Sequence, residues 1–404
     1  MALCVDLGTY TCKAGFGGLE SNSTSRWTPD VIIKPVDNND DIIYEFEPST
    51  SSNNDTTFLK SRSVNKERFS ELFQKLVLET NIEPDESSIL ISTPMTSSML
   101  EKHTIANILF EEFNVKSLYF GYAPMFAAFA KGKTSAIVLN SGHDCTSLTE
   151  IHDGLIDHKK TSFFSIAGKD ITEAYGKCFL NETKDNNKLI HQFEVGTDKF
   201  WPNNNIYSIV KEKFAFVSKK LDHDRTKTKN GSNLQRYKLP DGSWITTSQP
   251  NYEAPQILFD RSNEEEEDNK MSSKFSDIKQ VFGNKGWSEN GNIVDMFYHH
   301  TCKVNKDLKN PILDVIFTGG NTMIKSFDKK FQLEFKHICE HFDRGVLRAE
   351  KYAAKHADTR FQANKYAAWA GCSMLAGYSP LIPLYVTKEQ YNEVGDKIIT
   401  SRYK

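Results

Sequence analysis

Three short turns combine glycine with hydroxyl or amide side chains directly after an apolar run. They are Gly8-Thr9, Ser141-Gly142 and Gly319-Gly320. Backbone N–H groups in such turns converge on an anion, and neighbouring hydroxyls add donors with little bulk. Two such hairpins on facing lobes would clamp a polyphosphate, and the third turn would let a purine lie against backbone. Each turn alone is common in hairpins without a ligand, so their conjunction carries the prediction.

Cationic and titratable side chains near these turns extend the same chemistry. Lys13 lies where a cation would balance the negative charge of a phosphate. His143 follows the second turn, but a single histidine in a polar hairpin is more often a hydrogen-bonding residue than a base. His299, His300 and Cys302 do not predict a zinc site, because adjacent histidines cannot easily turn toward one ion.

Apolar strands precede all three turns and would position them. The pattern predicts strands over 2–5, from residue 136 and over 311–317, and a further strand over 90–94. The first and second turns repeat one arrangement of apolar strand, polar residue, glycine and hydroxyl residues, which suits a duplicated domain with one phosphate-facing hairpin per lobe. Helical spacing predicts helices over 64–79, 98–113, 324–337 and 366–377.

The whole chain sets broader limits. Its 404 residues are too many for one ordinary core, so two lobes are expected. A net charge of −3 gives no field that would concentrate nucleic acid, so sequence-specific nucleic-acid binding is not expected. No apolar stretch is long enough to span a membrane or to act as a secretory leader. The seven cysteines are scattered without C-x-x-C spacing and predict reduced thiols.

Six segments resemble actin's motifs in actin's order, and the resemblance runs from Ala2 to Lys404. The segments are Val5-Asp6-Leu7-Gly8-Thr9 through Lys13-Ala14-Gly15-Phe16, Val138-Leu139-Asn140-Ser141-Gly142, Val210-Lys211-Glu212-Lys213, Leu239-Pro240-Asp241-Gly242, Phe317-Thr318-Gly319-Gly320-Asn321-Thr322-Met323 and Lys365-Tyr366-Ala367-Ala368-Trp369. The resemblance implies an α/β fold of the duplicated type that actin shares with hexokinase and chaperone ATPases, with two lobes and four subdomains around a nucleotide cleft.

The resemblance also implies how the chain divides. Residues 1–135 would form the first lobe, with its second subdomain reduced at 34–63, and 136–335 the second lobe. Residues 336–404 would return to the first subdomain. A polar insertion covers about 263–292, and its acidic run at 264–268 would solvate a loop or dock a basic partner.

The cofactor that the resemblance implies is ATP, with Mg²⁺ held weakly. The adenosine side would be held by Lys211 and Glu212 near the base and ribose, Gly319 and Gly320 beneath the adenine, Lys365 beside it and Gly168 opposite. The full set of implied binding residues is Asp6, Gly8, Thr9, Lys13, Asn140, Ser141, Gly142, Gly168, Lys211, Glu212, Gly319, Gly320, Met323 and Lys365.

Departures from actin fall on the phosphate side. Tyr10 stands where actin has glycine, and its bulk would crowd the phosphate turn. Ala123 and Ser147 replace the glutamine and histidine that position and relay a proton for the attacking water, and neither is a good base. Asn140 and His143 replace two aspartates of the metal's water shell. The resemblance therefore implies a pseudo-ATPase, with no catalytic residue and no protein metal ligand.

Altered segments at 34–63 and 263–292 disfavour filament growth. The 8–11 and 142–144 turns, Asp153-Gly154 and the tail at 391–395 look most like nuclear actin-related proteins of the fourth class. Those are subunits of chromatin-remodelling and histone-acetyltransferase assemblies, which implies a nuclear location and a long motor-subunit helix, and also actin, as partners. The groove for that helix would be lined by Phe129, Leu375, Tyr378, Pro380 and Leu384, although single apolar positions are more often core.

Two other functions stay open from the sequence. One is a cytoskeletal relative, either dynactin-type or filament-associated, with a cytoplasmic location. The other is an active ATPase or sugar kinase of the same superfamily, for which Asp144 is the one carboxylate near the second turn.

Overall fold

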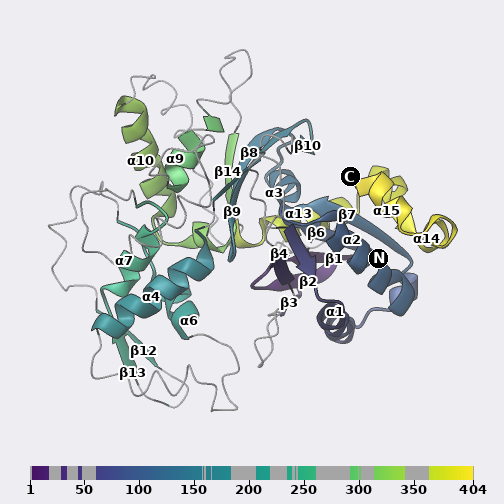
Figure 1. Ribbon diagram of the computed structural model, residues 1–404, viewed down its shortest axis with the longest axis horizontal. Coiled ribbons are helices and arrows are strands. Elements are labelled where there is room, and N and C mark those ends of the chain that lie inside the picture. Colours follow the sequence, from purple (N-terminus) through teal and green to yellow (C-terminus); the bar gives the residue numbers. More distant parts are fainter. Residues whose placement is uncertain are drawn as a thin grey trace.

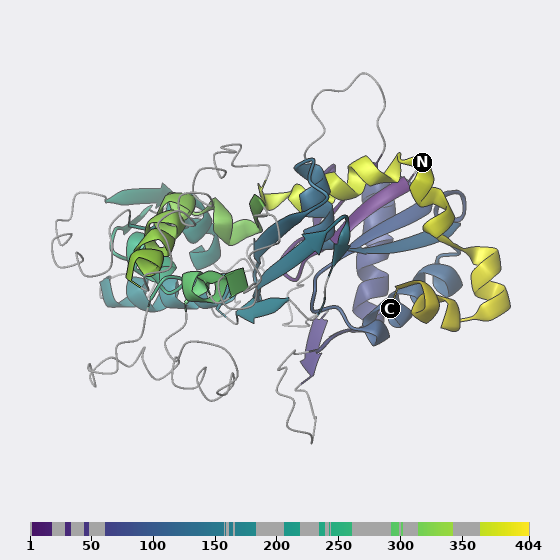
Figure 2. The same ribbon diagram turned by 90° about the horizontal axis from the view of Figure 1, so that it is seen from above.

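Two separate sheets organise the part of the chain that the computed structural model describes (Figure 1). The described residues are 2–17, 29–33, 44–47, 61–156, 158, 161–164, 166–182, 206–218, 234–238, 242, 244–260, 292–298, 300–301, 314–341 and 364–403. The sheets lie side by side, with helices on their outer sides and the helices α3 (Ala123–Ala130) and α13 (Ala367–Ala376) between them (Figures 1 and 2). Both chain ends lie on the side of the first sheet.

The first sheet carries the first glycine turn. Its strand order is β15-β7-β6-β1-β2-β3, in which β1 pairs antiparallel with β2 and parallel with β6. The strands are β1 (Ala2–Leu7), β2 (Cys12–Gly17), β3 (Val31–Ile33), β6 (Ser88–Thr93), β7 (Ser117–Tyr122) and β15 (Val386–Thr387). Every residue of β1 is buried, as expected for a central strand that is covered on both faces.

The alternation of side chains along β1 decides which helices cover each face. Leu3, Val5 and Leu7 join one core with α1 (Lys66–Thr80), α2 (Met99–Asn107) and α15 (Lys397–Tyr403). Cys4 points to the other face, where it packs with Phe126 of α3 and Trp369 of α13. The indole N–H of Trp369 donates to the Cys4 carbonyl over 3.1 Å. The helix α14 (Lys388–Val394) begins at a capping box formed by Thr387 and Gln390.

The second sheet carries the second and third turns. Its order is β10-β9-β8-β14, and β11 pairs with β9. The strands are β8 (Ala136–Ser141), β9 (Thr146–His152), β10 (Leu155–Ile156), β11 (Ser162–Phe164) and β14 (Asp314–Thr318). β8 and β14 are parallel neighbours, so the turns that follow them emerge at the same edge of the sheet.

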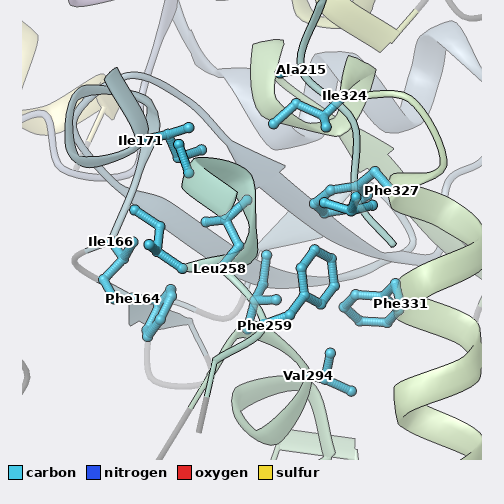
Figure 3. Packing of buried hydrophobic residues seen from close by; sticks show 14 of the residues in the cluster. Phe164, Ile166, Ile171, Ala215, Leu258, Phe259, Val294, Ile324, Phe327 and Phe331 are labelled. Atoms are coloured by element: carbon cyan, nitrogen blue, oxygen red, sulfur yellow. The ribbon is translucent and has the colours of Figure 1, made fainter. Parts of the chain in front are cut away.

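One face of this sheet is covered by the larger hydrophobic core. Ile137, Leu139 and Phe317 pack there against a cluster rich in phenylalanine, part of which is drawn in Figure 3. Phe331 lies edge-on to Phe317, with ring centroids 5.0 Å apart, a favourable aromatic geometry. The covering helices are α4 (Gly168–Glu182), α6 (Ile206–Phe214), α7 (Pro250–Gln256), α9 (Ile293–Tyr298) and α10 (Phe327–His341).

The crossing of α3 and α13 joins the two sheets. Phe126 of α3 belongs to the core of the first sheet, whereas Ala127 and Ala128 pack against β8 of the second. Gly371 allows this crossing, because a Cβ there would lie 1.8 Å from the Phe126 carbonyl oxygen. The backbones of the two helices are therefore in direct contact.

Where the structure describes the predicted strands and helices, the local predictions are confirmed with two differences; residues 311–313 of one predicted strand lie outside the described residues. Predicted helix 98–113 is α2 followed by a π-helical turn, η2 (Ile108–Glu112), in which the Phe113 N–H donates to the Ile108 carbonyl. Predicted helix 324–337 begins three residues later, because Ser326 adopts a left-handed φ of 70°. The remaining elements are β4 (Tyr44–Glu47), β5 (Ser61–Val64), η1 (Pro84–Glu86), β12 (Gln235–Lys238), β13 (Trp244–Thr247), η6 (Gly320–Met323) and η7 (Ser379–Leu384).

Several predicted features lie outside the described residues. The insertion at 263–292, apart from Asn292, is one of them, and so is most of 34–63, where β4 pairs antiparallel with β5. The proposed lobe boundaries remain predictions. Within the described residues, no helix combines the length and the apolar character needed to cross a membrane.

Candidate functional site

A cavity of about 320 Å³ lies where the three glycine turns meet. Its size falls at the lower end of the range typical of small-molecule sites. Of the implied binding residues, those that line it are Asp6, Gly8, Thr9, Lys13, Asn140, Gly142, Gly168, Lys211, Glu212, Gly319, Gly320, Met323 and Lys365. The structure therefore brings together residues from both sheets that are separated by up to 359 positions, from Asp6 to Lys365.

Ser141 is the one implied residue that does not line the cavity. Its side chain is fully buried beneath the second turn, and its hydroxyl lies 2.8 Å from the Thr146 hydroxyl. It also accepts a hydrogen bond of 3.0 Å from the Asn321 amide. Ser141 thus supports the turn from below.

The first turn is organised by a buried ion pair. Asp6 and Lys13 are opposite each other in the β1–β2 hairpin, and Nζ of Lys13 lies 2.7 Å from Oδ2 of Asp6. The other carboxylate oxygen accepts a 2.9 Å hydrogen bond from Ser92 on β6. Gly8 is needed because a Cβ there would come within 2.6 Å of the Thr11 carbonyl oxygen. The positive charge of Lys13 is therefore partly neutralised by Asp6.

The third turn is pressed against the second. Gly319 has φ 92° and ψ 160°, a conformation that glycine alone adopts readily. A Cβ on Gly319 would lie 2.3 Å from the Ser141 carbonyl oxygen, whereas one on Gly320 would meet nothing within 4 Å. Asn321 donates from its amide to the Gly142 carbonyl over 2.7 Å. The two turns therefore form one unit, and Gly320 faces open space in the cavity.

The start of α4 packs against the second turn, and helix α6 packs against the start of α4. The Gly168 N–H donates to the Gly142 carbonyl over 2.9 Å, and Lys169 N–H donates to the His143 carbonyl. Lys211 of α6 donates to the Gly168 carbonyl and to the Thr172 hydroxyl. Burial lowers the pKa of Lys211 to about 8, with Glu212 opposing the shift.

Lys365 and Glu212 meet at the edge of the cavity. Nζ of Lys365 lies 3.7 Å from Oε2 of Glu212, and both side chains keep substantial solvent exposure. An ion pair of this kind contributes little to stability. Its hydrogen-bonding atoms remain available to a polar ligand, which suits a ribose.

Tyr10 and His143 meet between the first and second turns. Their rings are stacked, with centroids 4.8 Å apart and an interplanar angle of 25°. The Tyr10 hydroxyl lies 2.9 Å from Oγ of Ser208 on α6, within hydrogen-bonding distance. Burial lowers the pKa of His143 to about 4, and Asp144 opposes this shift while Lys211 and Lys169 add to it. The His143 ring is therefore neutral near pH 7.

The positions implied for hydrolysis carry no effective base. Ala123 lines the cavity with a methyl group, and Ser147 is buried on β9 opposite Asn140. Asp144 is a cavity carboxylate, and it lies 3.5 Å from Nζ of Lys169. The described residues contain no cluster of three or more histidine, cysteine or acidic side chains placed to hold a metal ion.

Asn321 and Arg62 are two of the cavity residues that the sequence interpretation did not assign to binding. Asn321 directly follows the two glycines of the third turn, and this position could have indicated that it lines the cavity. Arg62 also lines the cavity, but it lies in a polar stretch with no recognisable pattern. Its role depends on Glu101, which is 39 residues away.

The histidines set aside for zinc are partly described. His300 is buried, with Nδ1 3.2 Å from the Ser162 hydroxyl and Nε2 3.7 Å from a carboxylate oxygen of Glu150. His299 and Cys302 lie outside the described residues.

A second surface includes the residues predicted to line a groove. Tyr378 is 57% exposed and Leu384 45% exposed, and Pro380 is also exposed. Phe129 and Leu375 are half-buried. Ile382, which the sequence interpretation missed, is 63% exposed. None of these side chains is fully buried. We call the five that lie at the end of α13 and along η7 the η7 surface: Leu375, Tyr378, Pro380, Ile382 and Leu384.

Comparison with known proteins agrees with this geometry. The family profile described as Actin matches residues 1–404. A protein of Dictyostelium discoideum named "Putative actin-29" is 24% identical over 416 aligned residues, which cover 98% of this chain and 96% of the relative. An "Actin-like protein" of Neurospora crassa is 24% identical over 327 residues, covering 78% of this chain and 73% of that protein. With two sheets, two similar glycine hairpins facing one cavity and a match along its whole length, the chain belongs to the actin family.

Proposed function

We propose that this chain is a non-filament-forming actin-family subunit that binds an adenine nucleotide without hydrolysing it. The observation that carries the proposal is the cavity lining. Nearly all of the implied binding residues surround one cavity, while Ala123 occupies the position implied for the residue that orients the attacking water. A binding cleft is thus combined with a hydrolytic position that has no proton acceptor.

The adenosine end of ATP fits the residues present. A Cβ built on Gly320 would meet no atom within 4 Å, so the backbone there borders open space in which a flat ring has room. Glu212 and Lys365 supply polar atoms beside it. Bound nucleotide would stabilise the fold by mass action and link the two sheets. Mg²⁺ would be held weakly, because Asn140 and His143 contribute no negative charge toward it.

Slow or absent hydrolysis follows from the bases near the turns. Asp144 lies beside Lys169, and a histidine whose pKa is about 4 is a weak base at neutral pH. Losing a well-placed proton acceptor costs about 10²–10⁴-fold in rate.

Phosphate release from Mg²⁺-ATP tests this part. The purified chain should release phosphate far more slowly than conventional actin under the same conditions. Turnover at actin's rate that disappears in Asp144→Ala would instead support an active ATPase. The chain should also remain in the supernatant after centrifugation with Mg²⁺ and ATP, and pelleting would favour the filament-associated alternative.

We further propose that the chain works in the nucleus, as a structural subunit of a chromatin-remodelling or histone-modifying complex. The η7 surface supports this proposal, since exposed aromatic and leucine side chains suit an amphipathic partner helix. The partner would be a long helix of the motor subunit, and actin would be a second partner. A dynactin-type role in the cytoplasm is the alternative.

Purification of the tagged chain from cells tests the location and the partner. A remodeller motor subunit should accompany the wild-type chain and be lost in the double variant Tyr378→Ser/Ile382→Ser. Leu78→Ser is the matched control, because Leu78 is even more exposed, at 74%, but lies on α1. Recovery of dynactin components in place of a remodeller would move the proposal to the cytoskeletal alternative.

A further inference from the structure

Tyr10 reaches from one sheet of the molecule to the other. It belongs to the turn of the β1–β2 hairpin, and both of its described partners belong to the other half of the cleft. His143 follows β8, and Ser208 is on α6. The ring is therefore held at two points, by stacking on one residue and by a hydroxyl contact with another.

This contact occupies the space between the two phosphate-type turns. Rings whose centroids are 4.8 Å apart at a small interplanar angle are in van der Waals contact. A phosphate group cannot lie between them. A ligand that carries phosphates into this space must first move Tyr10 away from His143 and Ser208.

The charges around the same space also disfavour a polyphosphate. His143 is neutral near pH 7 because burial lowers its pKa to about 4. Lys13 is paired with Asp6 at 2.7 Å, and Asp144 adds a carboxylate to the lining. The two carboxylates that line the cavity, Asp6 and Asp144, thus offset part of the positive charge that Lys13 would offer to an anion.

The other end of the cavity has no such obstruction. Gly320 faces open space, and the Glu212–Lys365 pair is partly solvent-exposed. The cleft thus has an end open to a ring and a sugar, and an end where the Tyr10–His143 stack takes up part of the space between the two turns.

We propose that Tyr10 makes the cleft select adenine ligands by phosphate number, so that a nucleoside monophosphate binds more tightly than ATP. This inference rests on the adenine site of the proposed function and adds the discrimination between ligands. When ATP binds, Tyr10 must move, and the protein loses the ring stack with His143 and the hydrogen bond with Ser208. Together these are worth on the order of tenfold in affinity.

Calorimetric titration of the full chain with AMP, ADP and ATP, each with and without Mg²⁺, tests the proposal. Wild-type protein should bind AMP about tenfold more tightly than ATP. Tyr10→Gly should tighten ATP binding by about tenfold and change AMP binding by less than about threefold, because it removes the obstruction alone. Ser208→Ala should shift the ratio in the same direction by about threefold, since it removes one hydrogen bond outside the cavity lining.

Two results would overturn the inference. One is tighter binding of ATP than of AMP by the wild-type chain. The other is an AMP-to-ATP ratio that is unchanged in both Tyr10→Gly and Ser208→Ala, with circular dichroism showing that the variants are folded. Equal affinity for all three nucleotides would reject the selection and leave the proposed adenine site standing. No binding of any adenine nucleotide by the wild-type chain would reject both.

Discussion

The guanidinium of Arg62 is paired with the carboxylate of Glu101, and neither side chain is exposed to solvent. Arg62 ends up beside the cleft because it also donates to the Leu7 carbonyl over 3.2 Å, directly before the first turn. Glu101 lies in the first turn of α2, where its backbone N–H donates to the Ser98 side chain. The pair thus links strand β5, helix α2 and the first glycine turn.

Breaking this pair from one side should be costly. Arg62→Met leaves the Glu101 carboxylate buried without its counter-ion, and the free energy of unfolding should fall by about 3–5 kcal/mol. The double variant Arg62→Met/Glu101→Leu should recover much of that loss, because no uncompensated charge remains. Urea denaturation measures both.

Lys66→Met is the matched control for the ion pair. Lys66 pairs with Glu112 at 3.3 Å with a mostly exposed side chain, so its loss should change stability by less than about 1 kcal/mol. Equal effects of Arg62→Met and Lys66→Met would contradict the structural role of the buried pair.

Replacing each of the two adjacent glycines of the third turn with alanine should have a different effect: one change should lower stability and the other should weaken ligand binding. Gly319→Ala forces a positive φ on a residue with a side chain and drives its Cβ into the Ser141 carbonyl, which should cost about 2–3 kcal/mol of stability. Gly320→Ala meets no neighbour, so its stability should stay within about 1 kcal/mol of the wild type. Its methyl group should instead weaken binding of adenine ligands. Thermal unfolding and nucleotide titration of the two variants, side by side, separate the effects.

The contact between α3 and α13 should tolerate no added atom. Gly371→Ala places a methyl carbon 1.8 Å from the Phe126 carbonyl oxygen, and both partners are helix backbone. Separating the helices should cost about 3 kcal/mol and lower the melting temperature. Ser373→Ala, two residues further along α13, should leave the melting temperature nearly unchanged. A stable Gly371→Ala protein would mean that the two helices cross less closely.

Stability should depend on pH through His143. Because burial lowers its pKa from 6.5 to about 4, the unfolded chain binds a proton more readily than the folded chain between those values. The free energy of unfolding should therefore fall as the pH drops from 6.5 toward 4, by up to about 1.4 kcal/mol per pH unit from this residue.

His143→Phe keeps an aromatic ring against Tyr10 but cannot take up a proton. Unfolding in urea at several pH values should show a shallower acid slope for this variant than for the wild type. The charged and titratable groups that act on His143 are Asp144, Lys211, Lys169 and Glu212. These groups remain in both proteins, so the difference in slope reports His143. Parallel slopes would place the acid sensitivity elsewhere.

Much of the local structure could be predicted from residue patterns. β1, β8 and β14 are apolar runs that end at glycine turns, and α1 shows its buried face in the spacing of Phe69, Leu72 and Leu76. Such signals are local, because strand and helix periodicity act over a few residues. The late start of α10 and the π-helical end of α2 were not predicted, since one depends on the left-handed backbone of Ser326 and the other on the hydrogen bond from Phe113 to Ile108.

By itself, the sequence determined that two similar hairpins and a third glycine turn exist, while its resemblance to actin implied that alanine and serine stand at the positions used for hydrolysis. These properties depend on residue types at short spacing. Only the tertiary structure decided that Tyr10 stacks on His143 and that Arg62 pairs with Glu101. It also decided that Ser141 lies beneath its turn and supports it. Each of these contacts depends on how separate elements pack around a shared cavity, and packing between distant segments leaves no periodic trace in the chain.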